Sequence, residues 1–528
     1  MSRIPAVLLC GLAWAGAATA AAPTPDRVTM SIDAGKPGAT INRHIFGQFA
    51  EHLGFGIYDG IWVGKDSPIP NTRGIRNDVV QALRAIKVPN VRWPGGCFAD
   101  YYHWRSGIGP KRAVTLNPDW GGVTEPNTFG THEFMDFAGQ IGAAPFISIN
   151  LGSGTVQEAA DWMEYMTSAQ ETTLAQERAA NGRKEPWQVP ILGIGNESWD
   201  CGGNMTPEFY VDQMKMHARF ARNYHPDQQE GDGRMLRIAV GPGGGDARFT
   251  EWTETVMKAW QNRKWSWDIE GISLHNYTVL NWDSKHVSVG FGEKDYAEIL
   301  RHTLKMDDLI RQHGGIMDRY DPEKKLILAV DEWGGWYAPK PGTNPGFLVQ
   351  EHTVRDAILA ALNINIFARH ADRVRIANIA QMINVLQAMI VTDKEKMLLT
   401  PTYHVFRMYV PFQDATYVPV NLEAGLWTHG NIALPRVDAI AAKGKDGKLY
   451  VSLTNIDPNR PVQIDASLAG FTARSATAET LTGDKVDSVN SFESPNAVAP
   501  KPLAVSTEGG RLRVTLPPKS VSVVALQP

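Results

Sequence analysis

Short apolar segments alternate with longer amphipathic stretches between about residues 44 and 391. The apolar segments predict eight strands, at residues 44–51, 90–93, 145–150, 190–197, 236–240, 271–275, 326–332 and 374–381. The intervening stretches predict helices, including residues 78–86, 133–141, 158–166, 207–224, 249–260, 296–313 and 354–370. Strands that are apolar throughout belong to a parallel sheet covered by helices on both faces. The pattern therefore predicts an α/β fold with a closed (β/α)8 barrel (a TIM barrel), and a doubly wound open sheet is the alternative.

The pattern changes near residue 395, where apolar and polar residues begin to alternate with a period of two. Predicted strands at residues 448–456, 462–468, 511–516 and 517–526 are separated by turn-rich gaps, which favours a C-terminal antiparallel β-sandwich. A strand-like segment at residues 28–32 precedes the barrel and is expected to join this sandwich. We therefore expect an N-terminal segment at residues 21–43, a catalytic barrel at 44–394 and a β-sandwich at 395–528.

The first twenty residues have the features of a secretory signal peptide. Arg3 precedes an apolar run at residues 6–16, and Ala18, Thr19 and Ala20 form a small-residue cleavage site. This pattern predicts a secreted or periplasmic protein after cleavage. Because no later segment approaches 18 uninterrupted apolar residues, we expect no membrane association.

Composition excludes several classes of function. Of the 528 residues 43% are hydrophobic and 20% charged, as in a folded soluble protein. The formal net charge is only −4 and the charges show no basic cluster, so nucleic acid is not an expected partner. The chain also lacks the spacing of common zinc and calcium motifs, so we expect no metal and no cofactor.

Two glutamates stand at the ends of predicted strands. Glu197 ends the fourth strand and Glu332 ends the seventh, each after an apolar run. Catalytic groups of a barrel gather at the carboxyl ends of its strands. Enzymes that cleave glycosidic bonds use two carboxyl groups, one as the proton donor and one facing the anomeric carbon, so this pair predicts that chemistry. Trp199 and Trp333 follow the two glutamates and would offer aromatic faces to a sugar.

Other candidates have equally plausible structural roles. Asn150 and His275 end the third and sixth strands, either as substrate contacts or as supporting hydrogen-bonding groups. Trp62, Trp104 and Trp336 are candidates for sugar stacking or for the core. The glycine-rich segment 241–245 lacks the Lys-Ser/Thr of a phosphate-binding loop and is interpreted as a tight barrel loop.

Six ordered motifs resemble glycoside hydrolase family 51, the α-L-arabinofuranosidase family. They are FGQFAEHLG at 46–54, RWPGGCF at 92–98, GNESW at 195–199, SLHNY at 273–277, DEW at 331–333 and AQMINV at 380–385. The resemblance covers essentially the whole chain after residue 20. It implies a barrel with Glu197 as the acid/base and Glu332 as the nucleophile.

The same resemblance implies the other site residues. Asn196 would bind the sugar's 2-hydroxyl, and Glu51, Cys97 and Gln381 would bind its remaining hydroxyls. Trp120 would line the pocket, Tyr277 would hold the nucleophile's oxygen, and Arg92 would keep that carboxylate ionised. An oxidising compartment permits a bond between Cys97 and Cys201, but a disulfide would replace a sugar contact. We therefore predict two free thiols.

These observations predict a retaining, exo-acting α-L-arabinofuranosidase. The expected substrates are arabinoxylan, arabinan or their oligosaccharides, and the resemblance leaves a homo-oligomer open. An endo-β-1,4-glucanase or xylanase on the same barrel is the nearest alternative. A carbohydrate-binding protein that has lost catalysis is another, although both glutamates are present. Retention predicts carboxyl groups about 5–5.5 Å apart.

Overall fold

The computed structural model describes residues 26–264 and 266–528, so the predicted signal peptide lies outside the described residues. Eight parallel strands form a closed barrel in the order β10-β11-β12-β13-β2-β5-β8-β9. The TIM barrel is thereby confirmed and the open sheet is wrong. The barrel strands are β2 (Gly47–Phe49), β5 (Asn90–Trp93), β8 (Ala144–Ile149), β9 (Ile191–Ile194), β10 (Leu236–Ala239), β11 (Gly271–Thr278), β12 (Ile327–Gly335) and β13 (Val374–Ile379).

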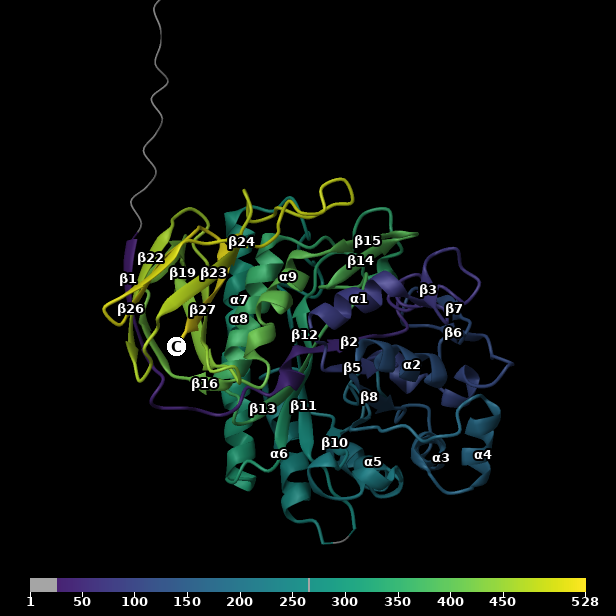
Figure 1. The fold of residues 1–528 in the computed structure, drawn as a ribbon. Helices are drawn as coiled ribbons and strands as arrows, with labels where there is room; N and C mark the ends of the chain where they lie inside the picture. Colours follow the sequence, from purple (N-terminus) through teal and green to yellow (C-terminus); the bar gives the residue numbers. More distant parts are fainter. Residues whose placement is uncertain (1–25, 265) are drawn as a thin grey trace, which may run out of the picture.

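Helices surround this barrel and cover its outer face (Figure 1). They are α1 (Asn77–Ala85), α2 (Thr131–Ile141), α3 (Val156–Thr167), α4 (Thr173–Ala180), α5 (Pro207–Phe220), α6 (Ala247–Gln261), α7 (Glu293–Tyr320), α8 (Val354–Arg369) and α9 (Pro401–Met408). Local sequence explains where they start: Thr206 caps α5 by accepting a hydrogen bond from Phe209 N, and Pro207 occupies the first helical position. The short helices α4 and α9 were not predicted.

Most of the predicted barrel strands have different bounds, and two of these differences affect the site. The first strand is only β2, because residues 43–46 form a 3₁₀ turn capped by Asn42. The fourth ends at Ile194, since Gly195 adopts a φ of 93°, in the left-handed region that glycine accepts readily. Glu197 therefore lies in the turn after the strand. The seventh continues to Gly335, which places Glu332 within β12, in register with His275 of β11.

Two further sheets form a sandwich beside the barrel. One has the order β17-β1-β22-β26-β25 and the other β16-β20-β21-β27-β23-β24. Pairing is antiparallel except that β1 runs parallel to β22. The strands are β1 (Asp26–Asp33), β16 (Thr416–Val418), β17 (Val420–Glu423), β20 (Val437–Lys443), β21 (Leu449–Asn455), β22 (Val462–Ala469), β23 (Ser475–Leu481), β24 (Lys501–Pro502), β25 (Val505–Glu508), β26 (Arg511–Leu516) and β27 (Ser520–Gln527). Apolar residues of the two sheets face each other and form a second core.

Helix α8 connects the sandwich to the barrel. It touches β12 and β13 on one side and β20, β21 and β27 on the other, and its residues 354–368 are all buried. Asn365 and Arg369 also bind Asp438 of β20, at 2.7 and 2.9 Å. Figure 1 shows the yellow C-terminal strands against α7 and α8. An amphipathic helix would leave one face to water, whereas α8 is covered on both.

Short hairpins complete the described chain. They are β3 (Asn71–Thr72) with β4 (Ile75–Arg76), β6 (Thr115–Asn117) with β7 (Val123–Glu125), β14 (Ile390–Asp393) with β15 (Lys396–Leu399), and β18 (Leu426–His429) with β19 (Ile432–Pro435). No helix among the described residues is long and apolar enough to span a bilayer.

Candidate active site

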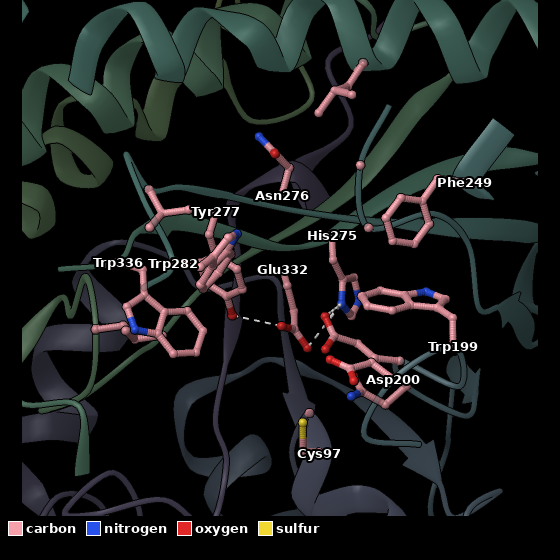
Figure 2. Close-up of a pocket in the computed structure, with 18 of the residues that line it drawn as sticks. Cys97, Trp199, Asp200, Phe249, His275, Asn276, Tyr277, Trp282, Glu332 and Trp336 are labelled. Atoms are coloured by element: carbon pink, nitrogen blue, oxygen red, sulfur yellow. Dashed lines mark hydrogen bonds and ion pairs between the residues drawn. The ribbon is translucent and has the colours of Figure 1, made fainter. Parts of the chain in front are cut away.

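A cavity of about 910 Å³ opens at the carboxyl ends of the barrel strands and contains both strand-end glutamates. Figure 2 shows Glu332 and His275 at its centre, with aromatic side chains on both sides. The cavity is also lined by Glu51, Cys97, Trp120, Asn196, Glu197, Tyr277 and Gln381. The structure thus brings to one surface every site residue that the family resemblance implies, except the buried Arg92. Arg92 lies directly behind Glu332.

Glu332 is a buried carboxylate held by two donors. Its Oε1 accepts a hydrogen bond of 2.8 Å from Arg92 Nη1, and its Oε2 accepts one of 2.8 Å from Tyr277 OH. The guanidinium of Arg92 is itself 1% exposed and lies over the ring of Phe49. These contacts fix the orientation of Glu332 and supply a nearby positive charge.

Arg92 extends the same network to Asn196. Its Nη2 donates to Asn196 Oδ1 at 2.6 Å, and its Nε lies 3.4 Å from Asp331 Oδ2. Burial lowers the pKa of Arg92, but the carboxylates of Asp331 and Glu332 outweigh that effect and raise it. Arg92 therefore pairs with two buried acids, Asp331 and Glu332, and holds Asn196 with the same guanidinium.

Glu197 faces Glu332 across the cavity. An oxygen of each carboxylate and a nitrogen of His275 lie within 4.8 Å of one another. His275 Nδ1 lies 2.8 Å from Glu197 Oε1, in hydrogen-bonding contact. Burial raises the pKa of Glu197, the charge of Glu332 raises it further, and the contact with His275 acts in the opposite direction. Burial and a neighbouring carboxylate are the conditions that raise the pKa of a carboxylic acid.

His275 lies among three carboxylates. Besides Glu197, its Nε2 is 3.0 Å from Asp331 Oδ1 and its Nδ1 is 3.6 Å from Glu332 Oε1. Burial lowers the pKa of His275, but the charges of Glu332 and Asp331 raise it to about 10. The ring is therefore a buried cation between the two glutamates at neutral pH. The sequence left this role undecided because it could not show that the sixth strand pairs with the seventh in this register.

Glu51 forms part of the cavity wall with two of the other predicted residues, Trp120 and Gln381. Its Oε1 accepts hydrogen bonds from Gly96 N and Trp120 Nε1, at 3.0 and 2.9 Å, and its Oε2 accepts one from Gln381 Nε2 at 2.9 Å. Burial raises the pKa of Glu51 to about 7, with a further contribution from the charge of Glu332, although the donors oppose this shift. Glu51 and Gln381 thus form one hydrogen-bonded unit behind Trp120.

The prediction of two free thiols is wrong. Cys97 and Cys201 form a disulfide, with their Cα atoms 5.6 Å apart. Loops that follow the non-adjacent strands β5 and β9 curl over the barrel mouth and meet there, which their separation of 104 residues does not reveal. Cys97 still lines the cavity, but a disulfide sulfur has no hydrogen to donate to a sugar hydroxyl. Cys201 Sγ lies 3.8 Å from Glu197 Oε2.

Some of the remaining sequence candidates line the cavity, and the others are part of the core or have structural contacts. Trp199 and Trp336 line the cavity, as do Gly243, Gly244 and Gly245 of the glycine-rich loop. Trp333 is fully buried against Phe367, so its proposed contact with sugar is wrong. The other three residues have structural surroundings: Trp62 packs on Phe129, Trp104 stacks on Trp162, and Asn150 accepts hydrogen bonds from Ser153 N and Gly154 N.

Several cavity residues were missed by the sequence interpretation. Trp282 follows β11, Phe249 belongs to α6, and His302, Lys305, Asp308 and Leu309 belong to α7. No local motif marks them, because helices of a barrel normally face away from its mouth. The only available signal was Trp282, an aromatic residue in a polar segment after a catalytic strand. Ligand atoms of Glu197, His275 and Glu332 are close enough to hold a cation, but each of these residues already has a protein partner.

A closed barrel with two facing carboxyl groups at the carboxyl ends of its strands defines the class of glycoside hydrolases. Comparisons with known proteins narrow that class. Residues 82–227 match the model of the α-L-arabinofuranosidase 1 domain, and residues 331–520 match that of the α-L-arabinofuranosidase C-terminal domain. An intracellular exo-α-L-arabinofuranosidase of Bacteroides ovatus is 44% identical over 505 residues, which cover 95% of each chain.

Solved structures agree with these matches. The family 51 arabinofuranosidase of Xanthomonas axonopodis pv. citri is 48% identical, with a TM-score of 0.91 over 95% of this chain and 100% of that chain. The thermostable family 51 α-L-arabinofuranosidase of Thermotoga petrophila is 31% identical, with a TM-score of 0.81 over the same shares. The chain belongs to glycoside hydrolase family 51, the α-L-arabinofuranosidases.

The expected secreted or periplasmic location needs correction. The Bacteroides ovatus relative, which aligns with 95% of this chain, is named an intracellular enzyme. The prediction depended on residues 1–20, which lie outside the described part of the structure. A short apolar run after a positive charge is therefore insufficient evidence for export.

Proposed function

We propose that this family 51 arabinofuranosidase is exo-acting and removes arabinofuranosyl side groups from arabinoxylan, arabinan or derived oligosaccharides. The observation that carries the proposal is the carboxylate pair, which has an oxygen of each group within 4.8 Å of the other in a cavity that Glu51, Asn196 and Gln381 also line. The relatives named above favour this activity over an endo-β-1,4-glucanase or xylanase.

The proposed first step forms a glycosyl-enzyme. Glu332 attacks the anomeric carbon while Glu197 donates its proton to the departing glycosidic oxygen. The contacts of Glu332 with Arg92 and Tyr277 support the nucleophilic role, since each donor holds one carboxylate oxygen and together they keep the carboxylate close to Glu197. In the second step Glu197 deprotonates a water molecule, which displaces Glu332 and releases arabinose. Arabinose therefore leaves with its original anomeric configuration.

The inner wall is proposed to bind the arabinofuranosyl group. Glu51, Asn196 and Gln381 offer polar atoms to its hydroxyls, Trp120 covers the ring, and Tyr277 holds the nucleophile. Glu51 is buried and already bonded to Trp120 and Gln381, which supports a preorganised pocket. Cys97 contributes packing only, because its sulfur belongs to the disulfide.

Retention of configuration is the direct test of the double displacement. Carboxyl groups this close leave no room for the water that an inverting enzyme places between substrate and base, which needs a separation of about 6.5–9.5 Å. We expect ¹H NMR at early times to show the α-anomer of arabinose before it mutarotates. The β-anomer as first product would contradict the assignment of Glu332 as nucleophile.

His275 is proposed as a positioning residue that lowers the pKa of Glu197. Replacing His275 by alanine removes a buried cation and a hydrogen bond that both lower this pKa. The pKa of Glu197 should then rise, so the alkaline limb of the pH profile of kcat/KM should move to higher pH. The matched control is His103→Ala, which removes an exposed histidine paired with Glu158. A limb that stays in place or moves to lower pH would show that His275 does not act through Glu197.

We further propose that residues 26–43 and 395–528 form one structural unit that the barrel needs. Truncation near residue 395 would uncover the α8 face that contacts β20, β21 and β27, and would remove both strand partners of β1. A large uncovered apolar face leads to aggregation. We therefore expect the truncated chain to be insoluble in a sedimentation assay, in contrast to the full chain. Soluble, fully active protein would refute this interpretation.

A further inference from the structure

The cavity is much larger than the pocket proposed for arabinose. Glu51, Trp120 and Gln381 form its inner wall, whereas the rest of the 910 Å³ is bounded mainly by the loops after β9, β10, β11 and β12 and by α7. Pockets of about 300–1,000 Å³ accommodate whole drug-sized ligands. A single pentose would leave much of this volume free, so the outer part is available to the group from which arabinose is cleaved.

The outer part contains two separate aromatic surfaces. On one side Trp199 meets Phe249 edge to face with centroids 4.9 Å apart, and the guanidinium of Arg248 lies over both rings. On the other side Trp282 meets Trp336 edge to face at 5.3 Å, and the ammonium of Lys285 lies over both. Figure 2 shows the two pairs on opposite sides of Glu332 and His275. The reacting bond therefore lies between them.

The glycine-rich loop holds the first surface in place. A Cβ atom on Gly243 would lie 2.5 Å from the ring of Trp199, so only glycine permits this contact. Trp199 Nε1 donates to Gly241 O at 2.9 Å, and Gln312 Nε2 of α7 donates to Gly245 O at 3.0 Å. Trp199 is thus fixed as a partly exposed side chain that lines the cavity.

We propose that Trp199 and Trp282 bind a β-linked pyranose main chain on the two sides of the unit that carries the arabinofuranosyl group. The inference rests on the proposed function and specifies its substrate. A pyranose with equatorial hydroxyls, such as xylose, presents flat faces of axial C–H bonds that pack on aromatic rings. A main chain substituted at an internal unit continues in both directions and needs both surfaces. A chain substituted at its end reaches only one, and the puckered rings of arabinan offer less flat area.

The experiment compares three substrates. They are 4-nitrophenyl α-L-arabinofuranoside, a xylotetraose with one arabinofuranosyl group on an internal unit, and a xylotetraose with that group on its non-reducing terminal unit. For Trp199→Ala and for Trp282→Ala, the ratio of kcat/KM on the internally substituted substrate to kcat/KM on the aryl substrate should fall about 10-fold. The corresponding ratio for the terminally substituted substrate, again taken against kcat/KM on the aryl substrate, should fall in only one of the two variants.

Controls separate binding from structural damage. Trp199→Phe and Trp282→Phe keep an aromatic face and should retain most of the wild-type ratio of kcat/KM on the internally substituted substrate to kcat/KM on the aryl substrate. Phe220→Ala removes an exposed aromatic residue of α5 outside the cavity and should leave this ratio unchanged. Ratios within two-fold of wild type for both alanine variants would overturn the proposal, as would an equal loss on all three substrates. An equal loss with both variants on the terminally substituted chain would overturn the two-sided binding. Wild-type protein inactive on the aryl substrate would instead refute the proposed function itself.

Discussion

Replacing Glu332 by alanine should abolish hydrolysis of every substrate, whatever its leaving group. The variant loses the atom that forms the glycosyl-enzyme bond, so activated aryl glycosides cannot compensate. Hydrolases that lose their nucleophile lose on the order of 10⁶-fold in kcat, and we expect a comparable loss here. Steady-state rates on an aryl α-L-arabinofuranoside and on an arabino-oligosaccharide measure it.

Glu332→Gln tests the same step with less disturbance of the site. The amide preserves the side chain's shape but is a far weaker nucleophile, so its activity should be nearly as low. Glu254→Ala is the matched control, because it removes a half-exposed glutamate outside the cavity and should leave the rate unchanged. Substantial activity of either Glu332 variant with the fold intact, as judged by thermal unfolding, would exclude Glu332 as the nucleophile.

Replacing Glu197 by alanine should separate substrates by their leaving groups. In natural substrates the leaving group is a sugar alkoxide, which departs poorly unless it receives a proton. For these substrates kcat/KM should fall by at least the ~10²–10⁴-fold typical of a general acid. An aryl arabinofuranoside needs little protonation and should still form the glycosyl-enzyme. That intermediate should accumulate, because the variant has no base to activate water, and intact-protein mass spectrometry would detect it.

Rescue by azide tests whether Glu197 is the acid/base residue. Azide needs no deprotonation, so it should restore turnover of the aryl substrate by Glu197→Ala and give an arabinosyl azide of retained configuration. Wild-type protein with the same azide concentration is the control and should give mainly arabinose. If azide instead rescues Glu332→Ala and yields a retained product, the two roles are reversed.

The barrel was predictable because each of its strands, and most of its helices, can be recognised from local sequence. Eight apolar segments separated by helical patterns require a buried parallel sheet, and that number closes a barrel. The same reasoning placed Glu197 and Glu332 at one end of it, since parallel strands share an orientation. Family motifs then named the inner wall, and the structure brings Glu51, Trp120 and Gln381 together there.

Features that depend on contacts between distant segments were not predictable. The sequence suggested free thiols, whereas the loops after β5 and β9 join Cys97 to Cys201, because the path of a loop depends on what it packs against. The burial of α8 on both sides has the same origin, since its second face is covered by strands far along the chain. Neither property is encoded in the segment that displays it.

By itself the sequence determined the fold class and the family, and it placed Glu197 and Glu332 at one end of the barrel, because these features depend on local periodicity and on motifs of adjacent residues. Only the tertiary structure decided that His275 is a buried cation between Glu197 and Glu332, since three strands must close in register before their charges interact. It also decided that α7 and Trp282 widen the cavity beyond one sugar. The physical reason is that charge interactions and cavity shape depend on distances in space, which separation along the chain does not specify.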